Sequence, residues 1–123
     1  MQLSINGKDV GLKVSMWVLD EDRLNKMYAE KPESIIWKFT STLFIAYKNF
    51  CRYSKMQPEI SIEDFELYVD DQLSSEEGRG FITGIFDDLS AQINAMAGTS
   101  EKKMPVSTLA GKEQESLPMA QSG

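Results

Sequence analysis

Histidine is absent from this sequence of 123 residues, and cysteine occurs once, as Cys51. The imidazole ring is the usual general base near neutral pH and the commonest metal ligand. Without it the chain cannot assemble a Ser-His-Asp triad, a Cys-His pair or an ordinary zinc site. A single thiol also excludes an internal disulfide framework. We therefore expect no enzyme activity, no metal site and no cofactor, although carboxylate and lysine chemistry stay formally open.

Long apolar runs are also missing. No segment approaches the roughly 20 apolar residues that cross a bilayer. Residues 1–14 alternate polar and apolar side chains, whereas a secretory signal has a basic end followed by a continuous apolar stretch. We predict a soluble cytoplasmic protein that does not bind membranes. The length and the 41% of hydrophobic residues suit one domain with a modest core.

Aromatic residues are absent from the C-terminal end of the chain. All twelve lie between Trp17 and Phe86, and residues 99–123 are rich in Ser, Gly, Gln, Lys and Glu. A segment of this composition buries too little apolar surface to offset the entropy lost on ordering it. The sequence therefore predicts a folded domain over residues 1–98 and a flexible tail over residues 99–123.

Positive charge is in deficit, with a formal net charge of −6. This argues against nucleic-acid binding, which depends on neutralising phosphates. The charge is also uneven: residues 31–55 contain five cations and one acid, whereas residues 59–88 contain ten acids and one cation. Two interpretations stay open. The stretches form complementary solvated faces of one domain, or the acidic stretch meets a basic partner.

The first 14 residues carry the pattern of a β-hairpin, with the turn signal Asn6-Gly7 at its centre. A two-residue turn would set Ile5 opposite Lys8, whereas a four-residue turn would set Ile5 opposite Val10. We prefer the four-residue turn because it places every apolar side chain on one face. That face must lie on helices or on another chain, since an isolated ribbon is marginally stable. The alternating apolar residues are Leu3, Ile5, Val10, Leu12 and Val14.

About four helices are predicted after the hairpin. Asp20 can cap a short helix, and Pro32 suits the first turn of a long helix that runs to about Met56 and ends before Pro58. The long helix is apolar over most of its girth, so we expect it at the centre of the core. Its apolar residues include Ile35, Ile36, Trp37, Phe39, Leu43, Phe44, Ile45, Tyr47, Phe50 and Tyr53.

Two capping-box patterns mark the later helices. Ser61 and Asp64 have the spacing of such a box, which predicts a helix from Ser61 to about Asp71. Ser74 and Glu77 repeat the pattern, and the last helix should end near Gly98. The last helix carries Ile82, Ile85, Leu89, Ile93 and Met96 at helical spacing. The fold class is therefore mainly α, with an N-terminal β-hairpin packed on a small bundle of about four helices.

Few residues offer chemistry beyond packing. Clustered carboxylates such as Glu63 and Glu66 would need burial to serve acid–base catalysis, and the pattern indicates a solvated face. Cys51 lies on an apolar helix and is expected in the core. Gly80 and Gly84 have the spacing of small residues at a close helix contact. That contact is predicted either within the chain or between copies in a homo-oligomer.

Candidate partner-binding residues are aromatic side chains of the domain and scattered apolar residues of the tail. Tryptophan is enriched at binding hot spots, although both tryptophans can equally belong to the core. Segments that become ordered on binding give modest affinity and easy release, so the tail is a second means of binding. The candidates are Trp17, Trp37, Phe44, Tyr53, Met104, Leu109 and Leu117.

Three segments resemble phage tail assembly chaperones of long-tailed phages and prophages. Those proteins commonly begin with a hairpin of the form I-N-G-K-x-x-x-L-K and a small helix, which resembles LSINGKDVGLKVSMWVLDEDRLNKMY here. Their P-S-x-E-E-I-x-D-Y-L-D region is similar to PEISIEDFELYVDDQL, and their closing amphipathic helix to FITGIFDDLSAQIN. The resemblance extends over residues 1–97. It departs from the family in residues 30–34, where small members often carry a glycine-rich stretch.

The resemblance implies a protein without catalytic residues. Such a protein binds the tape measure protein and tail tube subunits during tail assembly in the host bacterial cytoplasm, and it is absent from the mature virion. The alternative is a small acidic phage-encoded inhibitor that binds a host nucleic-acid enzyme. The acidic stretch at residues 59–88 favours this alternative, and the basic stretch at residues 31–55 counts against it.

Overall fold

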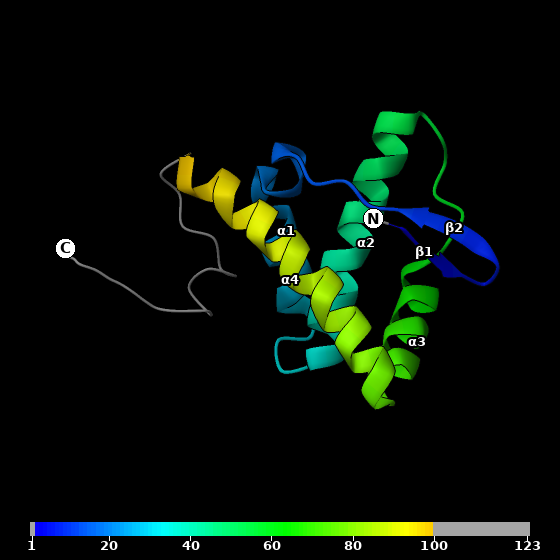
Figure 1. Cartoon of the computed structure of the whole chain (residues 1–123). Coiled ribbons are helices and arrows are strands. Elements are labelled where there is room, and N and C mark those ends of the chain that lie inside the picture. Colours follow the sequence, from blue (N-terminus) through cyan, green and yellow to red (C-terminus); the bar gives the residue numbers. More distant parts are fainter. Residues whose placement is uncertain (1, 100–123) are drawn as a thin grey trace.

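The computed structural model describes residues 2–99 of the chain (Figure 1). It is mainly helical, with an N-terminal hairpin and four α-helices, which confirms the predicted fold class. The predicted tail lies outside the described residues apart from Thr99, where the last helix ends. The elements are β1 (Gln2–Ile5), β2 (Lys8–Gly11), the 3-10 helices η1 (Met16–Val18) and η2 (Asp20–Asp22), α1 (Arg23–Glu30), α2 (Ile35–Ser54), α3 (Ile62–Leu73) and α4 (Glu76–Thr99).

The hairpin pairs in a different register from the one preferred above. Leu3 faces Val10 and Ile5 faces Lys8, so the chain turns through two residues and the four-residue turn is wrong. The two registers differ by a shift of two residues, and such a shift keeps every side chain on its own face. The apolar pattern therefore fitted both registers, and it could not choose between them.

The turn itself decides the register. Asn6 and Gly7 both have positive φ, at 55° and 77°. A type I′ turn requires this at both central residues, and its twist matches that of the paired strands. Lys8 then lies at the tip of the hairpin, where its ammonium pairs with the Glu59 carboxylate at 3.4 Å.

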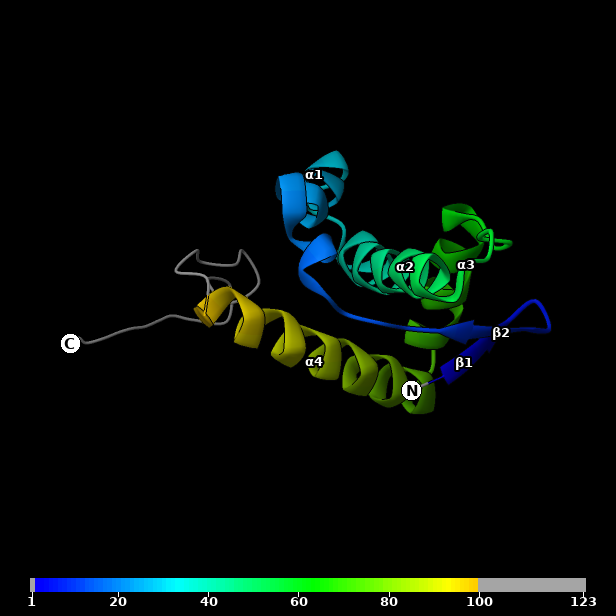
Figure 2. The same cartoon turned by 90° about the horizontal axis from the view of Figure 1, so that it is seen from above.

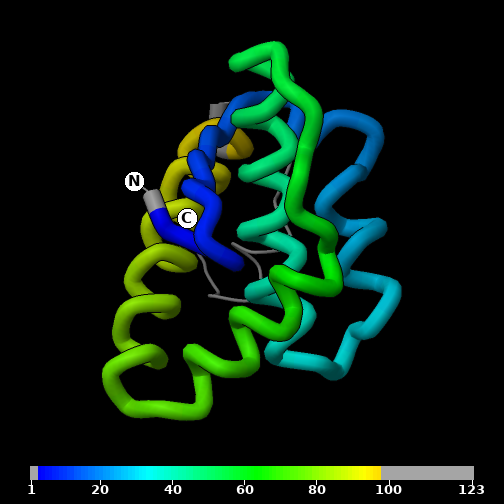
Figure 3. The backbone as a smooth tube through the Cα atoms, turned by 90° about the vertical axis from the view of Figure 1, so that its right-hand side faces the viewer, coloured from blue at the N-terminus to red at the C-terminus, as the bar shows by residue number. Residues whose placement is uncertain are grey.

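The apolar face of the hairpin packs between α2 and α4, as Figures 2 and 3 show from two directions. Three residues of that face, Leu3, Ile5 and Val10, are buried as predicted, and Leu12 is partly buried against the same core. The other buried members of this core are Leu43, Ala46, Tyr47, Cys51, Ile60, Phe65, Val69, Ile82, Ile85 and Leu89.

Helix α2 also contributes to a second buried cluster, which joins η1 and α1 to the later part of α4. Its members are Val18, Leu24, Ile45, Ile93 and Ala97. Because α2 lies between α1 and α4 and supplies residues to both clusters, it is the central helix, as the sequence predicts. None of the helices within residues 2–99 is long and apolar enough to cross a bilayer.

Helix α2 is shorter than predicted at both ends. Ser34 precedes it, and the Ser34 hydroxyl accepts a hydrogen bond from the backbone N–H of Trp37 at 3.0 Å. Pro32 lies in the turn before this cap rather than in the helix. At the other end Lys55 adopts a left-handed φ of 58° and stops the helix ahead of Pro58. A side-chain cap and a left-handed residue thus set the boundaries, and the two prolines lie beyond them.

The starts of α3 and α4 show one prediction confirmed and one wrong. The Ser61 hydroxyl caps α3 by accepting from the N–H of Asp64 at 3.2 Å. Helix α4 is capped by Ser75, not Ser74, because the Ser75 hydroxyl accepts from the N–H of Gly78 at 3.0 Å. Helix α4 ends at Thr99, one residue after Gly98 and so near the predicted end.

The short helix α1 does not start at the predicted cap either. Asp20 belongs to the 3-10 helix η2, and Asp22 is the residue directly before α1. Asp22 has a left-handed φ of 58°, and its side chain makes no capping hydrogen bond to the backbone. Its carboxylate instead accepts from the side-chain amide of Asn25 at 3.1 Å. The helix therefore begins after a backbone kink, which the spacing of acidic residues did not reveal.

The space around a glycine shows how closely its element packs against its neighbours. A Cβ atom built at Gly80 or Gly84 meets nothing within 4 Å, so the predicted close helix contact within the chain is wrong for the described residues. A Cβ atom at Gly11 would approach the Phe50 ring to 2.5 Å. Strand β2 therefore lies against α2 at a point where a side chain does not fit.

We expect Gly11→Ala to lower the free energy of unfolding by about 1–3 kcal/mol, because the Phe50 ring must move. Gly84→Ala is the matched control in the exposed part of α4, where alanine should stabilise the helix by about 0.5–1 kcal/mol. Urea unfolding followed by circular dichroism measures both changes. If the two variants change stability in the same direction, β2 does not pack on α2 in this way.

Candidate functional site

Two of the predicted aromatic residues have structural roles. Trp37 is 5% exposed, and its indole N–H donates to the carbonyl of Met27 at 2.7 Å, which joins α2 to α1. Phe44 is partly buried, and its ring centroid lies 5.3 Å from that of Phe65 in α3. Neither ring is presented freely to a partner. The tail candidates Met104, Leu109 and Leu117 lie outside the described residues.

The other two aromatic candidates, Trp17 and Tyr53, come together through cations. The guanidinium of Arg52 lies over both rings, 4.6 Å from the Trp17 centroid and 5.9 Å from the Tyr53 centroid. Arg23 lies over Trp17 at 4.1 Å, and the Lys13 ammonium lies over Tyr53 at 4.6 Å. We call these five side chains the cation–aromatic surface. Cation–π contacts of this kind contribute on the order of 0.5–1 kcal/mol each at exposed sites.

The surface is assembled from distant parts of the chain. Lys13 lies in the segment that leaves β2 and runs along α2, where its backbone N–H donates to the Ala46 carbonyl at 3.1 Å (Figure 2). This segment leads to η1 and places Trp17 beside Arg52, in the C-terminal part of α2. Arg23 begins α1, and its Nε donates to the Trp17 carbonyl at 2.9 Å.

A buried asparagine supports the surface from beneath. Asn49 is fully buried in α2. Its side-chain amide donates to the Lys13 carbonyl at 3.0 Å and to the Ser15 hydroxyl at 2.9 Å. Its carbonyl oxygen accepts from Arg52 at 2.6 Å. Asn49 thus fixes the segment after β2 and one of the arginines relative to α2. The sequence analysis missed Asn49, Arg52, Lys13 and Arg23.

The charges of this surface are poorly neutralised. Within residues 2–99 neither Lys13 nor Arg52 forms a salt bridge, and Arg23 reaches only Asp20, at 3.9 Å. The predicted complementary faces meet elsewhere, where Lys31 pairs with Glu66 at 2.9 Å. Among the described residues this is the one salt bridge between the basic and acidic stretches. Within residues 2–99 no carboxylate thus neutralises the charges of Lys13 and Arg52.

Exposed apolar side chains lie in this surface or near its members in the sequence. Tyr53 is 56% exposed, Met16 beside Trp17 is 51% exposed, and Met56 directly after α2 is 46% exposed. Apolar residues of this size that stay exposed next to arginines are typical of binding surfaces, where Trp, Tyr, Met and Arg are enriched. The other large exposed apolar residues are Ile35, Leu67 and Phe81.

Reactive groups are buried away from this surface. Cys51 is 1% exposed, as predicted for a core residue, and burial raises the pKa of its thiol, so the reactive thiolate is disfavoured. Burial likewise raises the pKa of Tyr28 to about 12, although its hydrogen bond with Thr42 opposes the shift. Residues 2–99 hold no group of three or more His, Cys, Asp or Glu side chains placed to bind a metal ion.

Comparisons with known proteins identify no relative. No protein-family model, no curated protein and no solved structure matches the chain.

Proposed function

We propose that this protein is a phage tail assembly chaperone that binds the tape measure protein and tail tube subunits during tail morphogenesis. It acts without catalysis in the cytoplasm of the bacterial host and is released before the virion is complete. The observation that carries the proposal is the cation–aromatic surface, together with the exposed side chains of Met16 and Met56. The resemblance of residues 1–97 to tail assembly chaperones supplies the identity of the partners.

A physical need explains why such a surface suits this task. A tape measure protein is long, helical and apolar on at least one face before the tail tube encloses it. An apolar face of that length aggregates unless another protein covers it. Exposed methionines adapt to varied apolar partners because their side chains are unbranched and flexible. Met16, Met56 and Tyr53 therefore offer a cover that tube subunits can later displace.

Co-expression with a tape measure protein of a long-tailed phage tests this proposal. The double variant Met16→Ser/Tyr53→Ser should strongly reduce the yield of soluble complex, because it removes apolar contact area while the core stays intact. The matched control is Ile35→Ser/Leu67→Ser, whose side chains are 60% and 67% exposed but lie outside the surface. Equal loss from both pairs would contradict a role for this surface. No loss from either pair would contradict the chaperone proposal.

The contribution of residues 100–123 is tested separately. Deleting them should leave the described fold intact, because both buried clusters lie within residues 3–97. We expect the truncated protein to hold less tape measure protein in solution, since it lacks the candidate apolar contacts Met104, Leu109 and Leu117. Circular dichroism checks the fold, and the pull-down yield checks binding. An unchanged yield would place all binding on the helical part.

One observation keeps the acidic inhibitor as a second candidate. Six carboxylates near the α3–α4 corner and along α4 are exposed and form no salt bridge within residues 2–99: Asp70, Asp71, Glu76, Glu77, Asp87 and Asp88. Such a face can resemble the charge of a nucleic acid. Inhibition of a host nuclease or polymerase that is lost on neutralising Asp70 and Asp71 would favour this candidate over the chaperone.

A further inference from the structure

The cation–aromatic surface also specifies the chemistry of the segment that it binds. Lys13 and Arg52 have no carboxylate partner within residues 2–99, although the formal net charge of the chain is −6. We propose that this surface binds an acidic peptide segment of a partner protein, with carboxylates on the arginines and Lys13 and an apolar side chain against Tyr53. The inference rests on the proposed function for the place of binding, and it adds the class of ligand.

The arginines are held in a way that suits carboxylates. Arg52 is exposed and uses one guanidinium nitrogen to reach Asn49, at 2.6 Å. Arg23 uses Nε to reach the Trp17 carbonyl, at 2.9 Å. A guanidinium that stacks on a ring keeps its remaining N–H groups in one plane, and this fork matches the two oxygens of a carboxylate. Both arginines are therefore oriented before a ligand arrives, which reduces the entropy lost on binding.

A nucleic acid fits the surface less well. Bases bind such surfaces by stacking on aromatic faces, but each ring here already has two cations over it. Arg23 and Arg52 occupy Trp17, and Lys13 and Arg52 occupy Tyr53. The overall charge of −6 also opposes a polyanion at long range. A short segment with a few carboxylates neutralises the local positive charge, and its small total charge is repelled less by the rest of the protein than a long run of phosphates would be.

A second copy of this chain is a weaker fit for the same electrostatic reason. It would bring its own acidic face to the surface, but its whole net charge of −6 would come with it. The exposed apolar side chains of Met16, Tyr53 and Met56 also require an apolar residue beside the carboxylates. An amphipathic acidic segment of another protein satisfies both conditions.

Selection from a displayed random-peptide library tests the inference. Full-length protein should enrich peptides that carry Asp or Glu beside a large apolar residue. Fluorescence anisotropy of one enriched peptide should show at least about tenfold weaker binding to Arg52→Gln, which corresponds to 1.4 kcal/mol. Arg52→Lys should bind with intermediate affinity, because it keeps the charge and loses the fork. Lys48→Gln makes an equal change of charge at an exposed position of α2 outside the surface, and it should bind as the wild type does.

A second variant, Lys13→Gln, separates a loss of binding from a loss of folding. Arg52 contacts buried Asn49, whereas the Lys13 side chain is exposed and only its backbone carbonyl bonds to Asn49. Lys13→Gln should therefore fold normally and still weaken peptide binding several-fold. Circular dichroism of each variant verifies the fold.

Several outcomes would overturn the inference. These are enrichment of neutral peptides, equal binding by wild type and Lys13→Gln, or equal competition by single-stranded DNA of the same charge. A wild-type dimer in sedimentation that Lys13→Gln dissociates would replace the peptide with a second copy. The peptide measurements contain no tail protein, so they separate the two proposals. Peptide binding without protection of the tape measure would overturn the proposed function alone, and protection without peptide binding would overturn this inference alone.

Discussion

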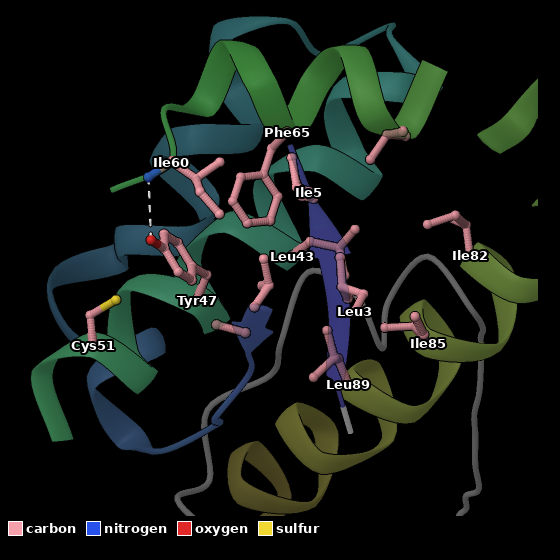
Figure 4. Packing of buried hydrophobic residues seen from close by; sticks show 13 residues of the cluster. Leu3, Ile5, Leu43, Tyr47, Cys51, Ile60, Phe65, Ile82, Ile85 and Leu89 are labelled. Atoms are coloured by element: carbon pink, nitrogen blue, oxygen red, sulfur yellow. Dashed lines mark hydrogen bonds between the residues drawn. The ribbon is translucent and has the colours of Figure 1, made fainter. Parts of the chain in front are cut away.

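Replacing Phe65 by alanine is expected to lower the free energy of unfolding by about 3–5 kcal/mol. The Phe65 side chain is fully buried where α3 meets α2, and its ring centroid lies 5.2 Å from that of Tyr47. Figure 4 shows it surrounded by Ile60, Ile5 and Tyr47. Alanine would leave a cavity between the hairpin, α2 and α3. These elements cannot all move in to fill it, so the van der Waals contacts of the Phe65 ring are lost. Urea unfolding followed by circular dichroism measures the change.

The matched control for this prediction lies two residues further along α3. Leu67 is 67% exposed, so Leu67→Ala removes a side chain of similar character without opening a cavity. Leucine and alanine both favour helices, and the change should stay within about 0.5 kcal/mol. A cost below about 1 kcal/mol for Phe65→Ala would mean that α3 does not seal the core.

Periodicity and capping signals predicted the parts of the fold that depend on local chemistry. The pair Ser61 and Asp64 predicted the start of α3, because a hydroxyl three residues before an N–H forms its cap without help from the rest of the protein. Ile60 and Phe65 are both buried beside that cap. Helix α2 carries apolar residues around most of its circumference. A helix of this kind is stable only when neighbouring elements cover it on several sides, so this pattern predicted its central position.

Signals that compete locally gave the errors. Pro32 and Ser34 both favour a helix start, and the structure uses Ser34 because its hydroxyl satisfies a backbone N–H. The end of α2 depends on Lys55 with a φ of 58°, a conformation that usually belongs to glycine or asparagine. No sequence rule marks a lysine for it. The hairpin register could be predicted only from the type of turn, because both registers place the same apolar side chains on the face that is buried.

The aromatic residues of the candidate site could be predicted from the sequence, but its cations could not. An aromatic pattern pointed to Trp17 and Tyr53, but it equally pointed to Trp37, which is buried. What separates them is the set of cations over the exposed rings, and these cations come from segments that approach one another only in the fold. Asn49 lies one turn before Arg52 and is one of the four buried polar residues of α2, with Thr40, Ser41 and Thr42. Most buried polar side chains have a hydrogen-bond partner, and the Asn49 amide has three.

Asn49→Ala should therefore be costly, at about 3 kcal/mol, although its side chain is small. The substitution removes three hydrogen bonds, to the Lys13 carbonyl, the Ser15 hydroxyl and the Arg52 guanidinium. Each bond contributes about 1 kcal/mol, and a buried acceptor left without a partner adds to the loss. The segment after β2 would no longer be fixed on α2. We thus expect Asn49→Ala to weaken acidic-peptide binding even at temperatures where the protein stays folded.

The control is Asn25→Ala, which removes one surface hydrogen bond, to Asp22 at 3.1 Å. It should change stability by less than about 0.5 kcal/mol and leave peptide affinity unchanged. Thermal unfolding gives the stability, and anisotropy below the unfolding transition gives the affinity. If Asn49→Ala lowers stability but binds the peptide as tightly as the wild type, Asn49 supports the core alone. The cation–aromatic surface would then orient its cations through the rings themselves, without the buried amide.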